Sequence, residues 1–262
     1  MTIAVPDGVI PEIRIGTASG KVTISTWDQP SIDIAASRPA RQRFALADNG
    51  VLDLTHSFGA SAIIEIRCPG GSNATIGTAS GRVVATGEMG RLSVTSVSGN
   101  VSIHRARVAE LRTVSGRIEV DSVADLARIS TRSGNVSLGD VTIAEISTAS
   151  GRVTAGPASG DLRAQSVSGR LELATNGRAN VHARTVSGQI SINLPPGTRP
   201  KLLVKARGAV DFTGTEGEDC TCRLQSVSGR IEVRLQRPPK RMPLRARCRD
   251  SSPSPTSLAS LS

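Results

Sequence analysis

The 262-residue sequence predicts an all-β protein, a β-solenoid that stacks coils of about 18 residues. Three observations favour this class. A Ser-Gly dipeptide recurs in one frame, apolar and polar residues alternate after each of these glycines, and aromatic residues make up only 2% of a chain that is 38% hydrophobic. A core of Val, Ile, Leu and Ala suits thin layers of strands, because β-branched side chains pack well on a pleated surface.

The Ser-Gly dipeptide marks the length of the repeat. Successive glycines in residues 78–193, where the repeats are clearest, are separated by 18, 17, 18, 17, 18 and 19 residues, which chance does not produce. A tight corner explains the glycine, because positive φ or a very close backbone approach costs little there. These glycines are Gly81, Gly99, Gly116, Gly134, Gly151, Gly169 and Gly188.

An apolar alternation follows each glycine, as in the phrase SGRIEV that ends at Val120. The second residue after the glycine is aliphatic, the fourth is aliphatic or Ala, and the residue between them, such as Glu119, is usually polar. This period of two indicates a strand with one buried face. Further glycines at the half-period divide each repeat into two strand units of about nine residues. They are Gly90, Gly160 and Gly177.

A single coil cannot bury its apolar side, so stacked coils that share one core are expected. A sheet of repeated hairpins is the main structural alternative. We expect the form of a right-handed β-helix, although neither the handedness nor the cross-section follows from the repeat itself.

Two intervals lack the clear phrase: 61 residues from Gly20 to Gly81, and 41 residues from Gly188 to Gly229. Both are predicted to contain degenerate coils, which is typical of solenoid ends because these must cap an exposed core. The solenoid is therefore predicted over residues 1–236. Segments with strand character inside the two intervals begin at Ser31, Val51, Ala62 and Lys201.

Residues 237–262 are predicted to be a basic, Pro/Ser-rich, disordered tail, because they lack apolar periodicity. The tail holds six Lys or Arg and one Asp, so it carries half of the net charge of +10. The solenoid is therefore only mildly basic. We predict no specific nucleic-acid binding, because the aromatic residues on which single-stranded bases stack are also scarce.

The residues favour a protein without catalysis, cofactor or metal site. Acidic residues are spread singly, whereas glycosidases need a pair of carboxylates. The serine of the SVSG phrase lacks the flanking glycines of a nucleophile elbow, and the Asp of calcium-binding nonapeptide repeats is missing. The cysteines have no zinc or disulfide spacing, and Cys220 and Cys222 are predicted to be core thiols. The histidines lie in unrelated phrases, at His56, His104 and His182.

Two columns of side chains are candidates for a surface function. The Thr/Ser-x-Ser column resembles arrays that bind ice if it faces outward, or forms internal stacking ladders if it faces inward. The column directly after the glycine is the better candidate for a recognition strip, although edge Arg and Asn also keep a solenoid soluble and prevent lateral pairing. This arginine strip consists of Arg82, Asn100, Arg117, Asn135, Arg152, Arg170 and Arg230, with Lys21 and Gln189 at equivalent positions.

The phrases TASGRV, SVSGNVSI and TVSGRIEV, and the closing SVSGRIEVRLQRP at Pro238, resemble the bacterial putative-adhesin β-strand-repeat family, also called domain of unknown function 4097. The resemblance covers residues 1–237. It implies a β-solenoid-like fold with no established activity, and it transfers no catalytic or ligand-binding residue to this chain. Many relatives carry membrane anchors or secretion signals.

The expected function is that of a non-catalytic scaffold or interaction module whose partner is an unknown protein or an acidic polymer. A cytoplasmic location is expected, because the sequence shows no signal-peptide pattern and no run of roughly 18 apolar residues. One alternative is a surface adhesin that binds glycan or protein. A weaker alternative is a carbohydrate-active β-helix enzyme. The oligomeric state does not follow from the sequence.

Overall fold

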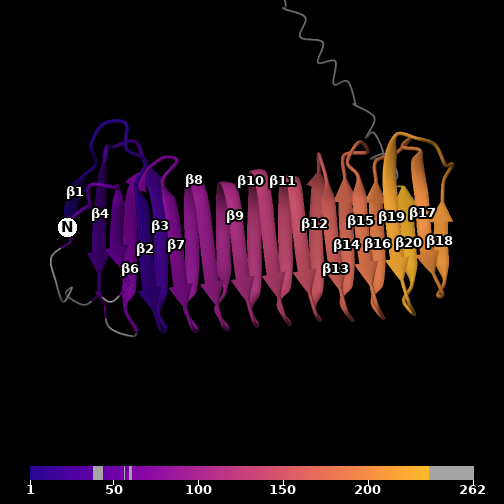
Figure 1. Ribbon diagram of the computed structural model, residues 1–262, viewed down its shortest axis with the longest axis horizontal. Coiled ribbons are helices and arrows are strands. Elements are labelled where there is room, and N and C mark those ends of the chain that lie inside the picture. The colour runs from indigo at the N-terminus through magenta and orange to yellow at the C-terminus, as the bar shows by residue number, and fades with distance from the viewer. Residues whose placement is uncertain (38–43, 56, 59–60, 236–262) are drawn as a thin grey trace, which may run out of the picture.

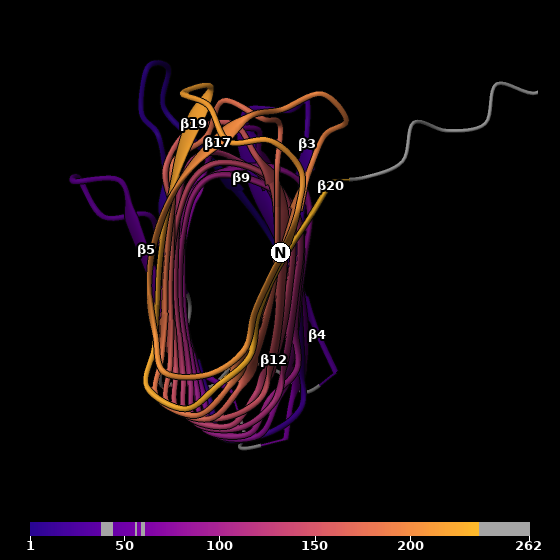
Figure 2. The same cartoon turned by 90° about the vertical axis from the view of Figure 1, so that its right-hand side faces the viewer.

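The computed structural model describes residues 1–37, 44–55, 57–58 and 61–235, and this part of the chain is all-β, with 20 strands and no helix. The strands stack into one long solenoid (Figure 1). Viewed down the stack, each coil is a flattened ring with two long sides and two narrow ends (Figure 2). The predicted fold class is confirmed, and with no helix in the described residues there is none that could cross a membrane.

One long side, the post-glycine face, is formed by the strands that follow the Ser-Gly turns. Its short strands are β3 (Lys21–Trp27), β6 (Ile63–Pro69), β12 (Arg152–Ala158), β14 (Arg170–Thr175), β16 (Gln189–Leu194), β18 (Val210–Thr213) and β20 (Ile231–Leu235), with β1 (Thr2–Ala4) and β4 (Ser31–Ala36) at the N-terminal end.

The other long side, the pre-turn face, is formed by the strands that lead into the turns. Its short strands are β2 (Glu12–Thr17), β5 (Val51–Leu54), β7 (Asn73–Thr78), β13 (Leu162–Ser166), β15 (Val181–Thr185), β17 (Pro200–Ala206) and β19 (Cys220–Ser226). Four long strands bend at a corner and belong to both faces: β8 (Arg82–Ser96), β9 (Val101–Thr113), β10 (Arg117–Thr131) and β11 (Asn135–Thr148).

Equivalent positions of successive repeats lie side by side. Ile118 pairs with Val136, and Thr131 pairs with Thr148, in parallel register. Among the described strands only β1–β4 and β4–β6 pair antiparallel, so the repeated-hairpin alternative is wrong. The aliphatic residue two positions after each glycine is buried, as Ile118 and Val136 are. Fully burying such a side chain stabilises the fold by about 1.5–3 kcal/mol.

The order of coils in the stack departs from the order of the sequence at both ends. The first coil, β2–β3, lies between the β5–β6 coil and the β7–β8 coil. The last coil, β19–β20, likewise lies between β15–β16 and the outermost coil, β17–β18. The two long intervals in the glycine spacing therefore each contain an additional coil, β5–β6 and β17–β18, and these coils lie outside the first and last Ser-Gly coils in the stack.

The Ser-Gly turns have a constant length. Five positions separate the hydroxyl residue that enters a turn from the first buried aliphatic residue after it, as in Thr131 to Val136. Thr131 is only 6% exposed, and its Oγ1 accepts a hydrogen bond from the Gly134 N–H at 3.0 Å. At turns whose glycine has positive φ, such as Gly151, the entering hydroxyl instead donates to the carbonyl of the following serine.

The two hydroxyl residues of each Thr/Ser-x-Ser unit therefore face in different directions. Its first hydroxyl is buried, whereas its second is exposed and donates to the turn of the neighbouring coil, as Ser168 Oγ does to the Ala149 carbonyl at 3.4 Å. Both hydroxyls satisfy backbone groups of the turns. Side chains with these roles hold the stack together and do not form a flat, outward Thr-x-Thr array.

Close approach explains the glycine at most turns. A Cβ on Gly169 would lie 2.5 Å from the carbonyl oxygen of Gly151, the turn glycine of the preceding coil. Gly169 does not have positive φ, so its requirement is steric rather than conformational. The same overlap with the neighbouring turn recurs along the glycine column.

The opposite narrow end of each coil varies in length. From the buried aliphatic residue to the next entering hydroxyl there are 12 positions in β9, 13 in β8 and β10, and 14 between Leu171 and Thr185. Register shifts mark this corner, between Ala85 and Glu88 and between Val123 and Leu126. The extra residues are absorbed as β-bulges, which add a residue to one strand of a pair.

Candidate recognition surfaces

The arginine strip is one continuous column on the post-glycine face, beside the turns. Arg117 pairs in register with Asn135, and Arg152 pairs with Arg170, which in turn pairs with Gln189. The side chains of its arginines are largely exposed, with 65% of Arg117 accessible. The structure thus brings all seven predicted residues together, and their role in recognition stays a prediction.

The asparagines of the strip have a structural role. Asn100 Oδ1 accepts a hydrogen bond from the Arg117 backbone N–H at 3.1 Å, and Asn135 Oδ1 accepts one from the Arg152 N–H at 3.2 Å. These bonds join neighbouring coils in the same way that backbone ladders do. The arginine side chains are consequently the members of the strip that are available to a partner.

Some arginines of the strip face glutamates on the same strand. Arg117 lies 3.7 Å from Glu119, and the equivalent pair on β14, Arg170 and Glu172, lies 3.9 Å apart. Exposed pairs of this kind contribute little to stability, so they leave the guanidinium groups free to exchange partners.

Five exposed valines lie in a row at the tips of the turns. This row was not identified from the sequence as a candidate functional surface. Each valine occupies the position between the two hydroxyl residues of the turn. The exposed fractions are 55% for Val97, 45% for Val114, 53% for Val167, 46% for Val186 and 52% for Val227. The apolar residue at this position was visible in the sequence, but only the stack shows that these side chains form one ridge.

The turns together form an edge without acidic residues, which we call the turn edge. It consists of residues 16–21, 77–82, 95–100, 112–117, 130–135, 147–152, 165–170, 184–189, 205–209 and 225–230. Within these ten segments there are eleven Lys or Arg and no Asp or Glu. The cations are Lys21, Arg82, Arg112, Arg117, Arg132, Arg152, Arg170, Arg184, Lys205, Arg207 and Arg230.

The opposite corner of the coils, which we call the bulged edge, has a different charge pattern. It consists of residues 86–91, 104–107, 121–125, 139–142, 156–161, 175–180, 195–199 and 214–219. These eight segments contain eight acidic residues and five arginines. The mild net charge of the solenoid thus conceals a separation of charge between its two narrow edges.

The pre-turn face carries a shallow groove with mixed charge. A hollow of about 690 Å³ lies over β9, β10, β11 and β13. Glu145 stands at its centre between two cations, with its carboxylate 3.0 Å from Arg128 Nε and 3.7 Å from Arg163 Nη1. Further hollows continue over β15, β17 and β19, where Arg184 and Arg223 line the surface.

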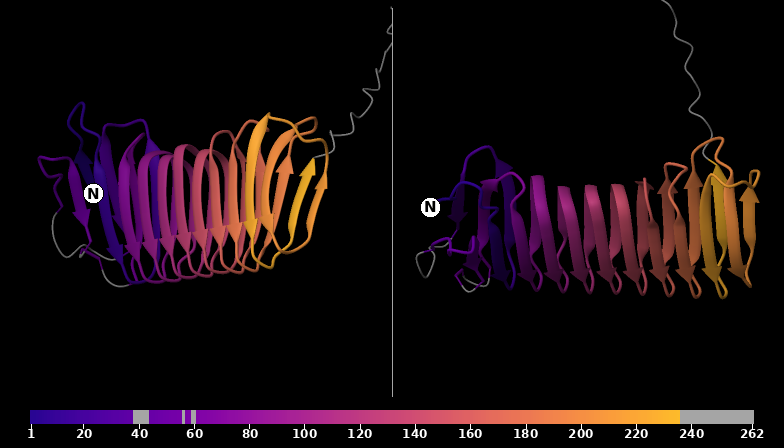
Figure 3. Two further views of the ribbon diagram at one scale, coloured as in Figure 1. Left: turned by 45° about the vertical axis from the view of Figure 1, so that its right-hand side comes forward. Right: turned by 45° about the horizontal axis from the view of Figure 1, so that its top comes forward.

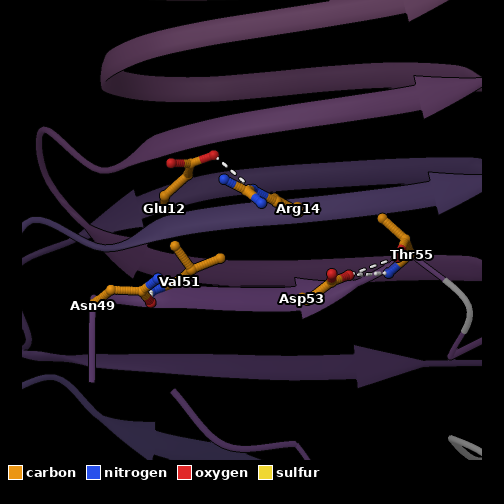
Figure 4. Close-up of polar contacts among 6 residues, drawn as sticks. All are labelled: Glu12, Arg14, Asn49, Val51, Asp53 and Thr55. Carbon is orange, nitrogen blue, oxygen red and sulfur yellow. Dashed lines mark hydrogen bonds and ion pairs between the residues drawn. The ribbon is translucent and has the colours of Figure 1, made fainter. Parts of the chain in front are cut away.

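Elsewhere on this face the charges pair locally. At its N-terminal end, Arg14 Nε donates to Glu12 at 2.8 Å, while Asp53 accepts both the backbone N–H and the hydroxyl of Thr55 (Figure 4). The hydrogen bond and the charge of Glu12 raise the pKa of Arg14 above its ordinary value. The N-terminal coils thus balance cations with acids, in contrast to the turn edge.

Groups that carry chemistry are scattered or buried. His104 contacts Asp121 at the bulged edge, whereas His182 lies on the pre-turn face, and His56 falls outside the described residues. Burial raises the pKa of the Cys222 thiol to about 12. No group of three or more metal-binding side chains occurs among the residues that the structure describes.

Comparison with known proteins is consistent with this architecture. The model of the Toastrack domain of unknown function 4097 matches residues 1–234. A putative adhesin from Bacteroides fragilis is similar in structure, with 15% identity, coverage of 89% of this chain and 95% of the other, and a TM-score of 0.44.

A putative adhesin from Parabacteroides merdae has 11% identity, the same coverage of both chains and a TM-score of 0.49. No curated protein matches the chain. The chain belongs to the Toastrack family of domain of unknown function 4097.

Proposed function

We propose that this protein is a non-catalytic interaction module that binds an acidic partner along its turn edge. The observation that carries the proposal is the presence of eleven cations and no acidic residue in the ten turn segments. Parallel strands are spaced by about 4.8 Å, so the stack places these cations in rows that follow its whole length. A long surface of one sign attracts oppositely charged partners and raises their rate of encounter.

Binding to a soluble polyanion tests this proposal. We expect the protein to bind polyglutamate and to be released by salt, because added ions screen exposed charges. Arg117→Glu combined with Arg152→Glu lowers the affinity by at least about tenfold if the turn edge is the binding surface. Arg105→Glu combined with Arg178→Glu makes the same change of charge on the bulged edge and serves as the control.

Equal losses in the two double variants would mean that net charge alone governs binding, and would overturn the proposal. Circular dichroism of each variant checks that the solenoid is intact. The altered side chains are exposed, so we expect both variants to fold.

A second candidate function is adhesin-like binding of an acidic glycan in the groove of the pre-turn face. The observation that favours it is the alternation of Arg128, Glu145 and Arg163 along the hollow. The two arginines are two coils apart, about 9.6 Å, and are placed to contact acidic groups on alternate sugars. Arg128→Ala combined with Arg163→Ala abolishes binding on an array of acidic glycans if this reading holds, and unchanged binding contradicts it.

We also propose a cytoplasmic location, which is the expectation from the sequence. Supporting this proposal, the described cysteines are free and buried, which suits a reducing compartment. Fractionation of cells with an antibody against the chain tests it, and recovery of the protein from the medium or the outer surface would contradict it.

A further inference from the structure

We infer that the acidic partner of the turn edge is the surface of an anionic lipid bilayer, on which the solenoid lies with its turns facing the lipid. This inference rests on the proposed function, since it names the partner of the same edge. Three properties of the edge support it: its shape, its apolar crest and the position of its cations.

The turn edge is a continuous, convex ridge that follows the length of the stack (Figures 1 and 2). The turns end in one row along the bottom of the molecule, and two further views show the same row (Figures 1 and 3). Backbone hydrogen bonds join successive turns, for example from the Ser115 N–H to the Val97 carbonyl at 2.8 Å and from the Ser133 N–H to the Val114 carbonyl at 2.9 Å. A rigid, convex ridge contacts a plane along its whole length, whereas an extended polymer is better held in a groove.

The crest of the ridge is largely apolar. The five valines at the tips of the turns are each about half exposed, alanine takes their place at residues 18, 79 and 149, and Arg132 is the one charged residue at this position of the nine Ser-Gly turns. A soluble polyanion would leave these side chains in water. At a bilayer surface they enter the boundary between head groups and acyl chains, which favours binding through the apolar area that is buried.

Cations flank the crest on both sides. In the coil around Val114, Arg112 lies on the pre-turn side and Arg117 on the post-glycine side. Arg184 and Lys205 extend the pre-turn row, and the arginine strip forms the post-glycine row. An apolar crest between two rows of cations matches a bilayer surface, where anionic head groups lie above apolar chains.

The hydroxyl groups of the edge argue against a neutral polar ligand. The exposed turn serines donate to backbone carbonyls of the adjacent coil, as Ser133 Oγ does to Val114 and Ser187 Oγ does to Val167. Few hydrogen-bonding groups on the ridge are therefore left for uncharged sugars. Charge and apolar area are what the edge offers.

Co-sedimentation of the full-length protein with lipid vesicles tests the inference. Vesicles in which about a third of the lipid is phosphatidylserine are compared with vesicles of phosphatidylcholine alone. We expect binding to the anionic vesicles only, and at least about a tenfold loss of affinity in the Arg117→Glu, Arg152→Glu double variant. The bulged-edge variant, Arg105→Glu with Arg178→Glu, retains most of its binding.

A triple variant separates the lipid surface from other polyanions. Val97→Ser, Val167→Ser and Val227→Ser together remove apolar area from the crest without changing the charge. We expect these substitutions to weaken vesicle binding by several-fold, on the order of fivefold, and to leave polyglutamate binding within about twofold of the original. Vesicle binding that is insensitive to these substitutions would overturn docking through the ridge.

The remaining outcomes are distinguishable. Binding to polyglutamate without binding to anionic vesicles would contradict the lipid inference but not the proposed function. Binding to neither would contradict both. A double variant in the basic C-terminal segment, Arg245→Glu with Arg247→Glu, makes the same change of charge beyond the residues that the structure describes. If it abolishes vesicle binding while the turn-edge variant binds normally, the turn edge is not the lipid-binding surface.

Discussion

The two narrow edges of the solenoid differ in geometry and in charge, although every coil contributes to both. At the turn edge, the nine Ser-Gly turns have the same five-position length and the same hydroxyl–glycine arrangement, and none of the ten turn segments contains an acidic residue. At the bulged edge, the coils differ in length by up to two residues, and acids and arginines are mixed. The comparison shows that the length of the coil is constrained at one edge only, and that this edge is also the one whose charge has a single sign.

Close packing alone does not explain this difference. At the turn edge a Cβ on Gly169 would lie 2.5 Å from the Gly151 carbonyl oxygen, and at the bulged edge a Cβ on Gly139 would lie 2.2 Å from the Asp121 carbonyl oxygen. The turn edge repeats the same tight turn in each Ser-Gly coil, whereas the strand register shifts at the bulged edge, and an additional residue protrudes there as a bulge. Interiors packed this closely respond to the addition of even one methylene group.

The largest effect is expected from inserting one glycine into the turn that follows β9, compared with the same insertion at the bulged corner within β9. An insertion after Val114 lengthens the turn and displaces Gly116 from its column, which disrupts packing against both neighbouring coils. We expect a loss of more than about 3 kcal/mol of unfolding free energy, or a protein that does not fold. An insertion after Arg107 gives β9 the corner length of β8 and β10, and costs less than about 1 kcal/mol.

Urea unfolding followed by circular dichroism measures both insertions. If the two insertions had equal effects, the assignment of the turn edge as the constrained edge would be wrong.

A smaller loss is expected from Gly169→Ala. The new Cβ would lie 2.5 Å from the Gly151 carbonyl oxygen, so the two coils must move apart, at a cost of about 1–3 kcal/mol. Gly70→Ala is the matched control, because a Cβ at Gly70 meets no atom within 4 Å and Gly70 does not have positive φ. Thermal unfolding compares the two variants, and a fully stable Gly169→Ala protein would contradict the close-packing explanation.

The smallest expected effect is a pH-dependent loss of unfolding free energy that arises from the thiol of Cys222, in the core between the two edges. Burial raises the pKa of this thiol from 9.0 to about 12. The unfolded thiol ionises near pH 9, while the folded thiol stays neutral. Its contribution to stability is therefore fully present below pH 9 and is lost as the pH rises towards 12. Between pH 8 and pH 10 the loss is about 1 kcal/mol for this thiol.

Urea midpoints at these two pH values measure the loss in the original protein and in Cys222→Ala. The variant is expected to lose less stability between pH 8 and pH 10, whatever its stability at pH 8. An identical pH dependence in the two proteins would show that Cys222 ionises normally in the folded state. Cys68, whose pKa burial raises to about 11, contributes a similar dependence to both proteins.

Local sequence patterns were sufficient to predict much of the fold. The alternation after each glycine predicted which residues are buried, since one face of a strand repeats every two positions. The constant glycine spacing predicted that Arg117 and Asn135 would lie in one column, because equal repeats stack in register. The role of the strip in binding stays a prediction.

Other features depended on contacts between distant segments. The valine ridge and the acid-free edge required knowing which turns lie side by side, including Gly20 beside Gly81 and Gly229 beside Gly188, across 61 and 41 residues. The facing of the Thr/Ser-x-Ser column also could not be read from the alternation, because the turn interrupts the strand between its two hydroxyls.

By itself, the sequence determined the class of fold, the coil length and the apolar columns, since these follow from local periodicity and from the steric demands of a stacked turn. Only the tertiary structure decided the order of the coils at the two ends. The degenerate coils β5–β6 and β17–β18 lie outside the first and last regular coils. Parallel pairing joins neighbouring strands by complementary backbone hydrogen bonds, which do not depend on sequence order. The β17–β18 coil therefore matches one neighbouring coil in parallel register, and so does the β5–β6 coil, whose outer side is covered by the antiparallel strand β4.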